Sequence, residues 1–206
     1  YIHTGGDEVM AKDWQDFAPN QELMKSLSQK NNHGLQCYFQ NRLNQTFINL
    51  GRKMIVWDEI VDCLPEGASV QAWRSIKPVK TATGAGYSAI VSLVYPWYLD
   101  YPDWPWELKK VYLFEPIPPD LPEAEENLVM GGEGCLWGER APENKIMPKL
   151  FPRLLAISEV LWSPKELRDW KSFKCRAKQV EKTFEKQGVR FIVLPLPILN
   201  PGKARD

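Results

Sequence analysis

The sequence is poor in histidine and lacks closely spaced cysteines, and both shortages narrow the chemistry open to it. Its 206 residues include only two histidines, His3 and His33, and four cysteines without any Cys-x-x-Cys spacing. A zinc site is therefore not expected, and we predict neither a metal nor a cofactor. The cysteines are expected to be free, buried thiols rather than disulfides. They are Cys37, Cys63, Cys135 and Cys175.

The chain also lacks a charge imbalance, a long apolar run and a nucleotide-binding glycine motif. Lys and Arg number 26, as do Asp and Glu, so the formal net charge is zero. Without a basic face, a nucleic-acid partner is not expected. No run of 18 apolar residues is present, so we predict no membrane span. No Gly-x-Gly-x-x-Gly follows a predicted strand, which leaves a dinucleotide-binding fold without support.

Apolar runs alternate with amphipathic segments, and this order predicts an α/β fold with parallel strands and helical crossovers. The expected strands are Tyr1–Gly5, Lys53–Trp57, Ser69–Trp73, Ala89–Val94 and Leu128–Gly132, of which the third is the weakest. The expected helices are Leu35–Leu50, Ile76–Ala85, Pro148–Trp162 and Trp170–Lys186. A long segment rich in proline and acids, Tyr101–Asn127, is expected to be a functional or disordered loop.

Two of these helices carry more specific expectations. In the first, Leu35, Phe39, Leu43 and Phe47 recur every four residues, which predicts an amphipathic helix that ends at Gly51. In the helix predicted over 148–162, Arg153 and Glu159 are expected to pair locally or to remain solvated.

Every predicted strand is followed by a tryptophan, a carboxylate or both. The sequences concerned are Asp7-Glu8, Trp57-Asp58-Glu59, Trp73, Tyr95 to Asp100, and Glu133 to Glu139. An open doubly wound sheet and a (β/α)8 barrel both fit the alternation, but a barrel gathers such residues at one face. The nine tryptophans and seven tyrosines suit either core packing or sugar stacking, and their placement favours a saccharide site. Adjacent acids suit acid–base chemistry at an acetal bond.

Four short motifs together resemble a known family. They are His-x-Gly-Gly-Asp-Glu from His3, Trp-x-Glu from Trp57, Trp-Tyr-x-Asp from Trp97, and Cys-Leu-Trp-Gly-Glu from Cys135. Their order and spacing over residues 1 to about 165 are similar to those of glycoside hydrolase family 20, the β-N-acetylhexosaminidases. The resemblance implies an exo-acting glycosidase that removes terminal non-reducing N-acetylglucosamine or N-acetylgalactosamine from an oligosaccharide or glycoconjugate.

The resemblance also implies an α/β fold in which residues 1–206 form the C-terminal portion of one (β/α)8 barrel. Strands four to eight of that barrel would be present, and residues 166–206 would form a terminal helix and a tail. The first three strands and an N-terminal domain would lie upstream of Tyr1, together with an arginine that binds the sugar. The chain alone is therefore expected to be insoluble or inactive.

Residue roles follow from the same resemblance. Glu8 is expected to act as the general acid, Asp7 to orient the substrate's 2-acetamido group, and Tyr98 to hold the acetamido oxygen. His3 is expected to support the acids by a hydrogen bond. The expected substrate-binding residues are Trp57, Trp73 and Trp137, which enclose the sugar, and Asp100 and Glu139, which accept its hydroxyl groups. Asp58 and Glu59 receive no role, and either could be a buried hydrogen-bond partner.

Two alternatives remain beside this interpretation. A diguanylate cyclase also contains Gly-Gly-Asp-Glu, but there Phe follows, whereas Val9 follows here. A non-catalytic barrel that binds N-acetylated sugars is the second alternative. The sequence leaves open gluco or galacto preference, the natural polymer and the oligomeric state, with a homodimer among the alternatives. The compartment is also open, although the resemblance favours an exported protein, whether periplasmic, secreted or lysosomal.

Overall fold

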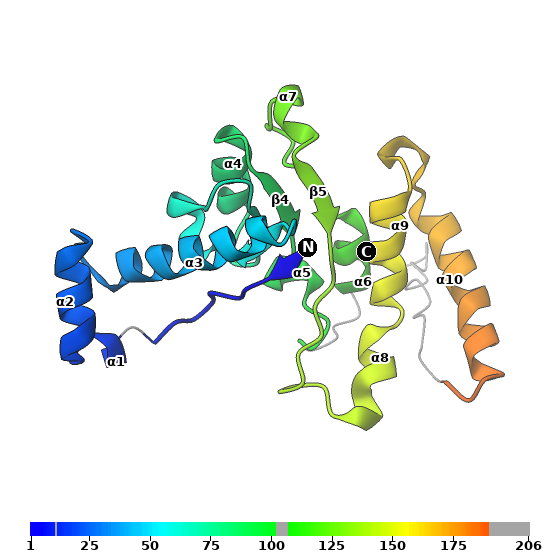
Figure 1. Ribbon diagram of the computed structural model, residues 1–206. Coiled ribbons are helices and arrows are strands. Elements are labelled where there is room, and N and C mark those ends of the chain that lie inside the picture. Colours follow the sequence, from blue (N-terminus) through cyan, green and yellow to red (C-terminus); the bar gives the residue numbers. More distant parts are fainter. Residues whose placement is uncertain (11, 102–106, 190–206) are drawn as a thin grey trace, which may run out of the picture. The chain divides into compact units, whose positions relative to one another are not determined.

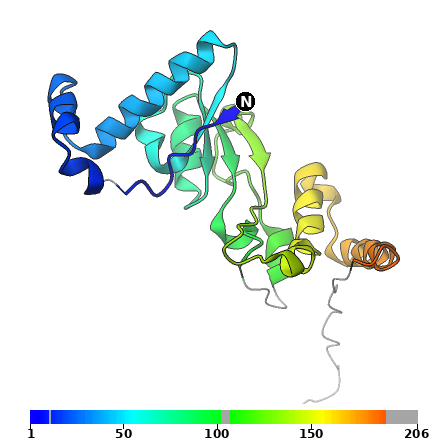
Figure 2. The same ribbon diagram turned by 60° about the horizontal axis from the view of Figure 1, so that its bottom comes forward.

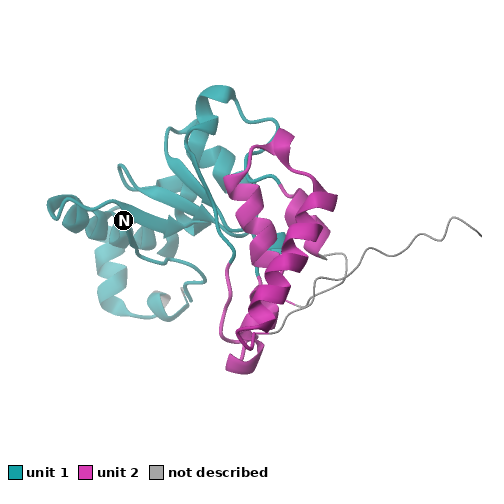
Figure 3. Ribbon diagram, turned by 90° about the vertical axis from the view of Figure 1, so that its right-hand side faces the viewer, with its two compact units in different colours: residues 1–98, 115–134 teal, residues 99–114, 135–206 magenta. Residues whose placement is uncertain are grey.

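The computed structural model describes residues 1–10, 12–101 and 107–189, and it divides the chain into two compact units. Unit 1 comprises residues 1–98 and 115–134, and unit 2 comprises residues 99–114 and 135–206 (Figure 3). Among the described residues, no helix has both the length and the apolar character needed to cross a membrane.

Unit 1 is built on a five-stranded parallel sheet whose strands lie side by side in chain order (Figures 1 and 2). Each strand matches one of the five predicted from the sequence. The strands are β1 (Ile2–His3), β2 (Met54–Trp57), β3 (Ser69–Ala72), β4 (Ser88–Val91) and β5 (Val129–Gly132). Sequential order and parallel pairing are what consecutive β–crossover–β units produce.

Helical segments connect these strands, and some of them pack against the sheet. Unit 1 contains α1 (Lys12–Gln15), α2 (Ala18–Ser26), α3 (Asn32–Asn49), η1 (Asp58–Cys63), α4 (Lys77–Gly84), α5 (Val94–Trp97) and α7 (Glu123–Glu126). Met54 and Val56 of β2 are fully buried and form a cluster with Ile60, against which Leu43 and Phe47 of α3 pack. Because strand side chains alternate, Ile55 and Trp57 of the same strand point to the other side.

The helix predicted over 35–50 is present as α3, but its buried face is more polar than the apolar repeat suggested. Leu35 is buried and Leu43 and Phe47 pack on the core, but Phe39 is 54 % exposed. The residues buried at four-residue spacing are instead Asn32, Gln36, Gln40 and Asn44. Amides of this set form hydrogen bonds with the backbone or with side chains of neighbouring segments, so burial and polarity coexist here.

A missing side chain lets the end of β5 pack closely. A Cβ atom at Gly132 would lie 2.3 Å from Cζ3 of Trp97 and 2.6 Å from the carbonyl oxygen of Val91. Trp97 is fully buried. The strand can therefore approach β4 and the Trp97 ring only because residue 132 has no side chain.

Unit 2 is helical in its described part. It contains α6 (Glu107–Leu113), η2 (Glu143–Lys145), α8 (Ile146–Leu150), α9 (Arg153–Trp162), η3 (Lys165–Leu167) and α10 (Trp170–Glu185). The helix predicted over 148–162 is thus two helices, α8 and α9. Phe151 is extended, with φ −106° and ψ 141°, because a residue that precedes proline is pushed out of the helical region.

The loop predicted over 101–127 also needs correction. It contains α6 and α7, while residues 102–106 lie outside the described residues. In α6, Tyr112 packs against the rings of Trp170 and Phe173 of α10. The Tyr112 hydroxyl donates to Glu159 Oε1 over 2.9 Å. Burial, aided by this carboxylate, raises the pKa of Tyr112 to about 12.

Arg153 and Glu159 do not pair with each other, contrary to the first of their two expected outcomes. Buried Arg153 donates through Nη2 to the carbonyl oxygens of Leu99 and, over 3.0 Å, Lys149. Glu159 accepts from Tyr112 and forms an ion pair with Arg176. Six residues place the two side chains on different sides of a helix, where each meets other partners.

The prediction of free, buried thiols is wrong for Cys37 and Cys63, which are bonded, and wrong in burial for Cys175. Cys37 of α3 and Cys63 of η1 form a disulfide with a Cα–Cα distance of 6.0 Å. Cys135 is free and buried as predicted, whereas Cys175 is free and exposed. The 26-residue separation of the bonded pair gives no pairing signal, because only the folded contact between α3 and η1 brings the two residues together.

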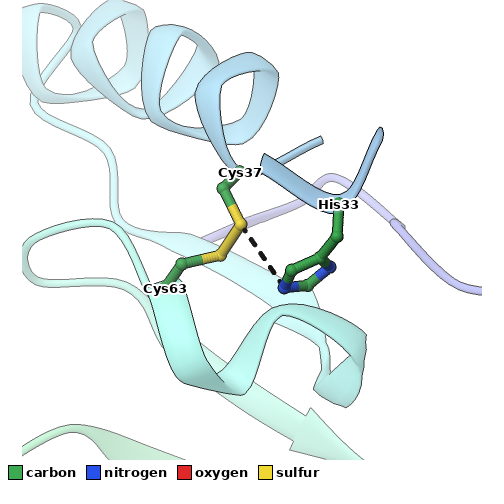
Figure 4. A group of neighbouring side chains, drawn as sticks. All are labelled: His33, Cys37 and Cys63. Atoms are coloured by element: carbon green, nitrogen blue, oxygen red, sulfur yellow. Dashed lines mark hydrogen bonds between the residues drawn. A yellow bond between two sulfur atoms is a disulfide. The ribbon is translucent and has the colours of Figure 1, made fainter. Parts of the chain in front are cut away.

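His33 lies beside this disulfide, as Figure 4 shows. Its Nε2 atom is 3.6 Å from Cys37 Sγ and 2.9 Å from Asp62 Oδ1. His33, Cys37 and Cys63 offer donor atoms within 4.8 Å of one another. Two of these donors are bonded to each other, so the group is a disulfide and its surroundings rather than an assembled metal site.

Candidate active site

Most of the predicted site residues of unit 1 lie at or just beyond the carboxyl ends of the parallel strands. Asp7 and Glu8 follow β1, Trp57 ends β2, Trp73 follows β3, and Tyr98 follows the α5 turn after β4. In parallel α/β structures this edge is where ligands bind. The sheet therefore places these five residues at the same edge.

The loop carrying the two acids is anchored to α3. Gln36 Nε2 donates to the carbonyl oxygen of Gly6 over 2.7 Å, and the Thr4 hydroxyl donates to Gln40 Oε1 over 2.9 Å. Gly6 has φ +100°, and a Cβ there would lie 3.0 Å from Gln40 Nε2. The loop thus combines a backbone conformation suited to glycine with close packing on the polar face of α3.

The acids themselves are exposed, and Glu8 has an unusual backbone. Its φ is +46°, in the left-handed region that residues with a side chain rarely adopt. Such a conformation costs about 1–3 kcal/mol and is concentrated at functional sites. This backbone strain motivates the hypothesis that the Glu8 carboxylate has a functional role.

His3 connects β1 to the same loop. Its Nδ1 atom accepts the backbone N–H of Gly5 over 3.0 Å, and its ring lies 4.9 Å from the Trp57 ring in an edge arrangement. Burial lowers the pKa of His3, although Glu133 and Asp7 oppose this shift. A lower pKa favours the neutral imidazole, which is the form that can accept a hydrogen bond at Nδ1.

Asp58 and Glu59, which the sequence left without roles, both contact the segment after β3. Asp58 is fully buried and accepts the backbone N–H groups of Trp73 and Arg74 over 3.2 and 3.3 Å. Its other oxygen accepts from Arg74 Nε over 2.6 Å. Glu59 accepts the indole N–H of Trp73 over 3.0 Å. Both acids are thus hydrogen-bond partners, as the sequence allowed.

A further polar group consists of one residue in β3 and the residues that directly follow β4 and β5. Buried Gln71 donates through Nε2 to Ser92 Oγ over 3.0 Å and to a carboxylate oxygen of Glu133. Gln36, Gln40 and Gln71 were not singled out from the sequence. The signal that could have revealed the first two is the polar repeat every four residues along α3.

Three predicted site residues belong to unit 2. Asp100 is buried, with its Oδ2 atom 3.6 Å from Arg140 Nη1. Its Oδ1 atom is also buried and has no hydrogen-bond partner among the described residues. Trp137 is 40 % exposed, and Glu139 is exposed.

The backbone around Asp100 is held by basic side chains of the following helices. Lys149 donates to the carbonyl oxygen of Asp100, and Arg153 donates to that of Leu99. The N–H of Leu99 donates to the carbonyl oxygen of Cys135 over 2.6 Å. The segment that carries the unpaired carboxylate oxygen is therefore fixed on both sides.

The structure contains hollows away from this edge as well. One of about 390 Å³ is lined by residues near the amino ends of β2 and β3, including Asn44, Lys53 and Gly67. It lies at the edge opposite to the candidate site. The amino-terminal edge of such sheets serves stability rather than chemistry, so the strand-end residues form the candidate site.

A parallel α/β sheet with paired acids and aromatic residues at its carboxyl edge is the arrangement expected of a glycoside hydrolase built on a (β/α)8 barrel. The sequence matches glycosyl hydrolase family 20, catalytic domain, over residues 1–165. The chain belongs to this family, and its five strands form part of the family's (β/α)8 barrel. The fold class and family inferred from the sequence are thereby confirmed.

Related proteins support the assignment. The chain is 35 % identical over 176 residues to beta-hexosaminidase subunit beta of Mus musculus, covering 82 % of this chain and 32 % of the relative. It is 34 % identical over 179 residues to subunit alpha of Bos taurus, covering 80 % and 33 %. The chain thus spans about a third of the length of these relatives.

Solved structures agree in fold. A chitobiase of Flavobacterium johnsoniae shares 32 % identity and a TM-score of 0.79, covering 92 % of this chain and 30 % of that chain. A family 20 exo beta-N-acetylglucosaminidase of Vibrio harveyi, solved in complex with N-acetylglucosamine, shares 27 % identity and a TM-score of 0.80. That comparison covers 93 % of this chain and 33 % of the other.

Proposed function

We propose that this chain carries the acid–base machinery of an exo-acting β-N-acetylhexosaminidase. The observation that carries the proposal is the Asp7–Glu8 pair at the same sheet edge as Trp57, Trp73 and Tyr98. The exo beta-N-acetylglucosaminidase activity of the Vibrio harveyi relative and its bound N-acetylglucosamine support a terminal N-acetylhexosamine as the group recognised. An oligosaccharide or glycoconjugate would supply that sugar.

In the proposed reaction the nucleophile belongs to the substrate. The acetamido carbonyl oxygen attacks C1 while the glycosidic C1–O bond breaks, and Glu8 gives its proton to the leaving oxygen. The Glu8 carboxylate then takes a proton from the water that opens the oxazolinium ring, with net retention. Such substrate assistance makes family 20 an exception to the usual glycosidase scheme of two catalytic protein carboxylates. A tethered nucleophile has an effective molarity of up to ~10⁵–10⁸ M.

Asp7 and Tyr98 would act on opposite ends of the acetamide. Asp7 accepts the acetamide N–H and so stabilises the positive charge that develops on the ring nitrogen. The Tyr98 hydroxyl donates to the acetamide oxygen and holds it in line with C1. Trp57 and Trp73 would enclose the methyl group, because an apolar wall excludes water from a reactive intermediate.

Asp100, Glu139 and Trp137 are the residues that we propose recognise a terminal sugar. The buried, unpaired Oδ1 atom of Asp100 is an acceptor that a sugar hydroxyl could satisfy. Glu139 would accept a second hydroxyl and Trp137 would stack on the ring. Acceptors for free 4- and 6-hydroxyls favour a non-reducing end, since a longer chain there would leave no hydroxyl to donate.

The first test is Glu8→Gln in the protein as its gene encodes it, assayed on aryl and alkyl N-acetyl-β-hexosaminides. Turnover should fall about 10²–10⁴-fold on the alkyl substrate, whose poor leaving group needs the proton most. The aryl substrate should lose less. The exposed acid Glu22 on α2 provides a matched control, Glu22→Gln.

The same assay separates the enzyme from the second candidate, a non-catalytic sugar-binding barrel. A binding protein would have no turnover in the unsubstituted form and would keep its affinity for N-acetylglucosamine after Glu8→Gln. Measurable turnover that disappears with Glu8→Gln would exclude that alternative.

The substrate-assisted step has its own test. Fluorine substitution of the acetamide methyl withdraws electrons and weakens the carbonyl as a nucleophile, so turnover should fall along an N-acetyl, N-fluoroacetyl and N-trifluoroacetyl series. Asp7→Asn should impair substrates bearing an acetamide through lost support of the developing charge. Turnover rates that stay the same on the fluorinated substrates and in Asp7→Asn would refute substrate assistance.

Two further predictions belong to this proposal, one about solubility and one about the compartment. Residues 1–206 produced alone should be insoluble or inactive, because a parallel sheet with open edges is prone to association. Robust hydrolysis of an aryl N-acetylglucosaminide by that chain would contradict it. The Cys37–Cys63 disulfide supports export, because disulfides persist mainly in oxidising compartments.

A further inference from the structure

We propose that Asp58 and Glu59 are positioning residues that fix Trp73 and thereby set the size limit for the acyl group on the substrate's 2-nitrogen. We name these two acids, with their contacts to Trp73 and Arg74, the η1 clamp. The inference rests on the proposed function, because it assigns Trp73 to the wall around that acyl group. It concerns two residues for which the sequence supplied no role.

Glu59 holds the far end of the Trp73 side chain. The indole Nε1 donates to both oxygens of the carboxylate, over 3.0 and 3.3 Å. Only 16 % of the Glu59 side chain is exposed. A tryptophan side chain has two rotatable bonds, so a hydrogen bond at the outer ring nitrogen restrains the tilt of the whole indole.

Asp58 holds the near end of the same residue. One of its oxygens accepts the backbone N–H of both Trp73 and Arg74, and the other accepts from Arg74 Nε. Arg74 Nη2 also donates to the Asp58 carbonyl oxygen over 2.9 Å. Because Asp58 is fully buried, these charge-assisted bonds operate in a low-dielectric environment, where they are strong.

The clamp joins the ends of two neighbouring strands. Asp58 directly follows Trp57, the last residue of β2, and its partners directly follow β3. The two predicted acyl walls, Trp57 and Trp73, are therefore linked through one short segment. The far end of that segment is fixed to α3 by the Cys37–Cys63 disulfide, so η1 is restrained at both ends.

The partly buried environment of Glu59 suits a carboxylate that accepts a hydrogen bond from the Trp73 indole. Burial raises the pKa of Glu59, while Arg74, whose Nε lies 3.9 Å away, opposes the shift, as does the Trp73 hydrogen bond. A fully exposed carboxylate would restrain the indole less, because water would compete for the indole N–H. Partial burial thus protects the one bond that orients the ring.

A wall held at both ends should discriminate by size. An indole that cannot tilt rejects an acyl chain longer than acetyl, whereas an indole released from Glu59 can yield to it. Release should therefore cost rate on the N-acetyl substrate, whose nucleophilic oxygen loses its alignment, and should favour N-propionyl and N-butyryl substrates relative to N-acetyl.

The experiment compares Glu59→Leu, which removes the acceptor, with Glu59→Gln, which keeps an amide oxygen at the same place. Both are measured in the protein as its gene encodes it, on aryl N-acetyl-, N-propionyl- and N-butyryl-β-glucosaminides. We expect Glu59→Leu to lower kcat/KM on N-acetyl about tenfold and to raise the N-butyryl to N-acetyl ratio. Glu59→Gln should restore much of both. Glu123→Leu on exposed α7 is the matched control.

A second background tests whether the effect passes through the indole. Trp73→Phe removes the ring N–H, so Glu59 has no indole left to hold in that variant. Adding Glu59→Leu to Trp73→Phe should therefore change kcat/KM and the acyl ratio by less than about twofold, which is within the error of additivity. An equal loss in both backgrounds would overturn the proposal and leave Glu59 with a merely structural role. An unchanged acyl ratio in Glu59→Leu would overturn it as well.

A readout without turnover keeps this inference distinct from the proposed function. The indole ¹⁵N–¹H resonance of Trp73, assigned by its loss in Trp73→Phe, should shift in Glu59→Leu, and affinity for N-butyrylglucosamine relative to N-acetylglucosamine should rise in calorimetry. An inactive unsubstituted protein that shows both changes would refute the enzyme and support the clamp. If the protein is active but Glu59→Leu changes neither the Trp73 indole resonance nor the acyl preference, the clamp is refuted and the proposed function is not.

Discussion

Asp58 in unit 1 and Asp100 in unit 2 are both buried carboxylates after a β-strand or the turn that follows one, yet their surroundings differ. Asp58 accepts two backbone N–H groups and Arg74 Nε. Asp100 has one oxygen near Arg140 and one without a hydrogen-bond partner in the part of the chain that the structure describes. Their burial alone does not distinguish the two residues, because both are almost fully buried.

The difference teaches how to separate a structural carboxylate from one kept for a ligand. A buried acceptor whose bonds are complete has no capacity left for substrate, and its loss should destabilise the fold. A buried acceptor with an unsatisfied oxygen carries a desolvation cost that a bound hydroxyl can relieve. Substitutions at and around these residues would break or sharpen the contrast.

The largest effect should come from the covalent link that supports the segment of Asp58. Replacing both Cys37 and Cys63 by serine should lower the free energy of unfolding by about 3 kcal/mol, because a closed loop of this length restricts the unfolded chain. Urea unfolding of the protein as its gene encodes it measures this. Replacing exposed Cys175 by serine is the control, and an equal loss there would contradict the assignment.

Asp58→Asn should come next, with a loss of about 2–3 kcal/mol in the free energy of unfolding. The amide cannot accept from all three donors, so at least one buried N–H or the Arg74 guanidinium loses its partner. The control is Asp120→Asn, which disrupts an exposed pair with Lys80 and should have a much smaller effect, as surface ion pairs contribute little. Similar losses in the two variants would remove the contrast.

Asp100→Asn should leave stability nearly unchanged and reduce function instead. We expect kcat/KM on an aryl N-acetylhexosaminide to fall about 10- to 100-fold, the value of a hydrogen bond between a hydroxyl and a charged acceptor. The free energy of unfolding should change less than in Asp58→Asn, because the Oδ1 atom of Asp100 has no completed hydrogen bond to lose among the described residues. A large loss of stability with normal turnover would place Asp100 in the same structural class as Asp58.

The smallest effect concerns His3, another acceptor near the site. Burial lowers the pKa of His3 from 6.5, so the neutral form is favoured in the folded state. The stability that this provides is complete above pH 6.5 and is lost as the pH falls through the lower folded pKa. The unfolding midpoint at successive pH values, compared with His3→Asn, measures it. An unfolding midpoint that rises on acidification, and does so only when His3 is present, would contradict the lowered pKa assigned to His3.

Features that depend on local pattern were predictable from the sequence. All five strands and the positions of Trp57, Trp73 and Tyr98 after them followed from apolar runs and flanking residues. Features that depend on partners distant in the chain were missed. The Cys37–Cys63 disulfide, the contacts of Asp58 with Arg74 and those of Arg153 with Leu99 exist only once separate elements meet.

The polar face of α3 was missed for a different reason. The apolar repeat of Leu35, Phe39, Leu43 and Phe47 and the polar repeat of Asn32, Gln36, Gln40 and Asn44 share the same spacing and the same helix. Hydrophobicity favoured the first, but the loop from Thr4 to Gly6 offers donors and acceptors that amides satisfy. Polar residues at helical spacing were the overlooked signal for a helix that supports a site.

The backbone of Glu8 has a consequence for how this protein would evolve in the laboratory. At φ +46°, glycine or asparagine would be less strained than glutamate. A library of variants at this position that is sorted for thermal resistance should therefore accumulate Glu8→Gly and Glu8→Asn. The same library sorted for sugar release should return glutamate. The residue found at position 8 would thus show whether a population was selected for thermal resistance or for sugar release.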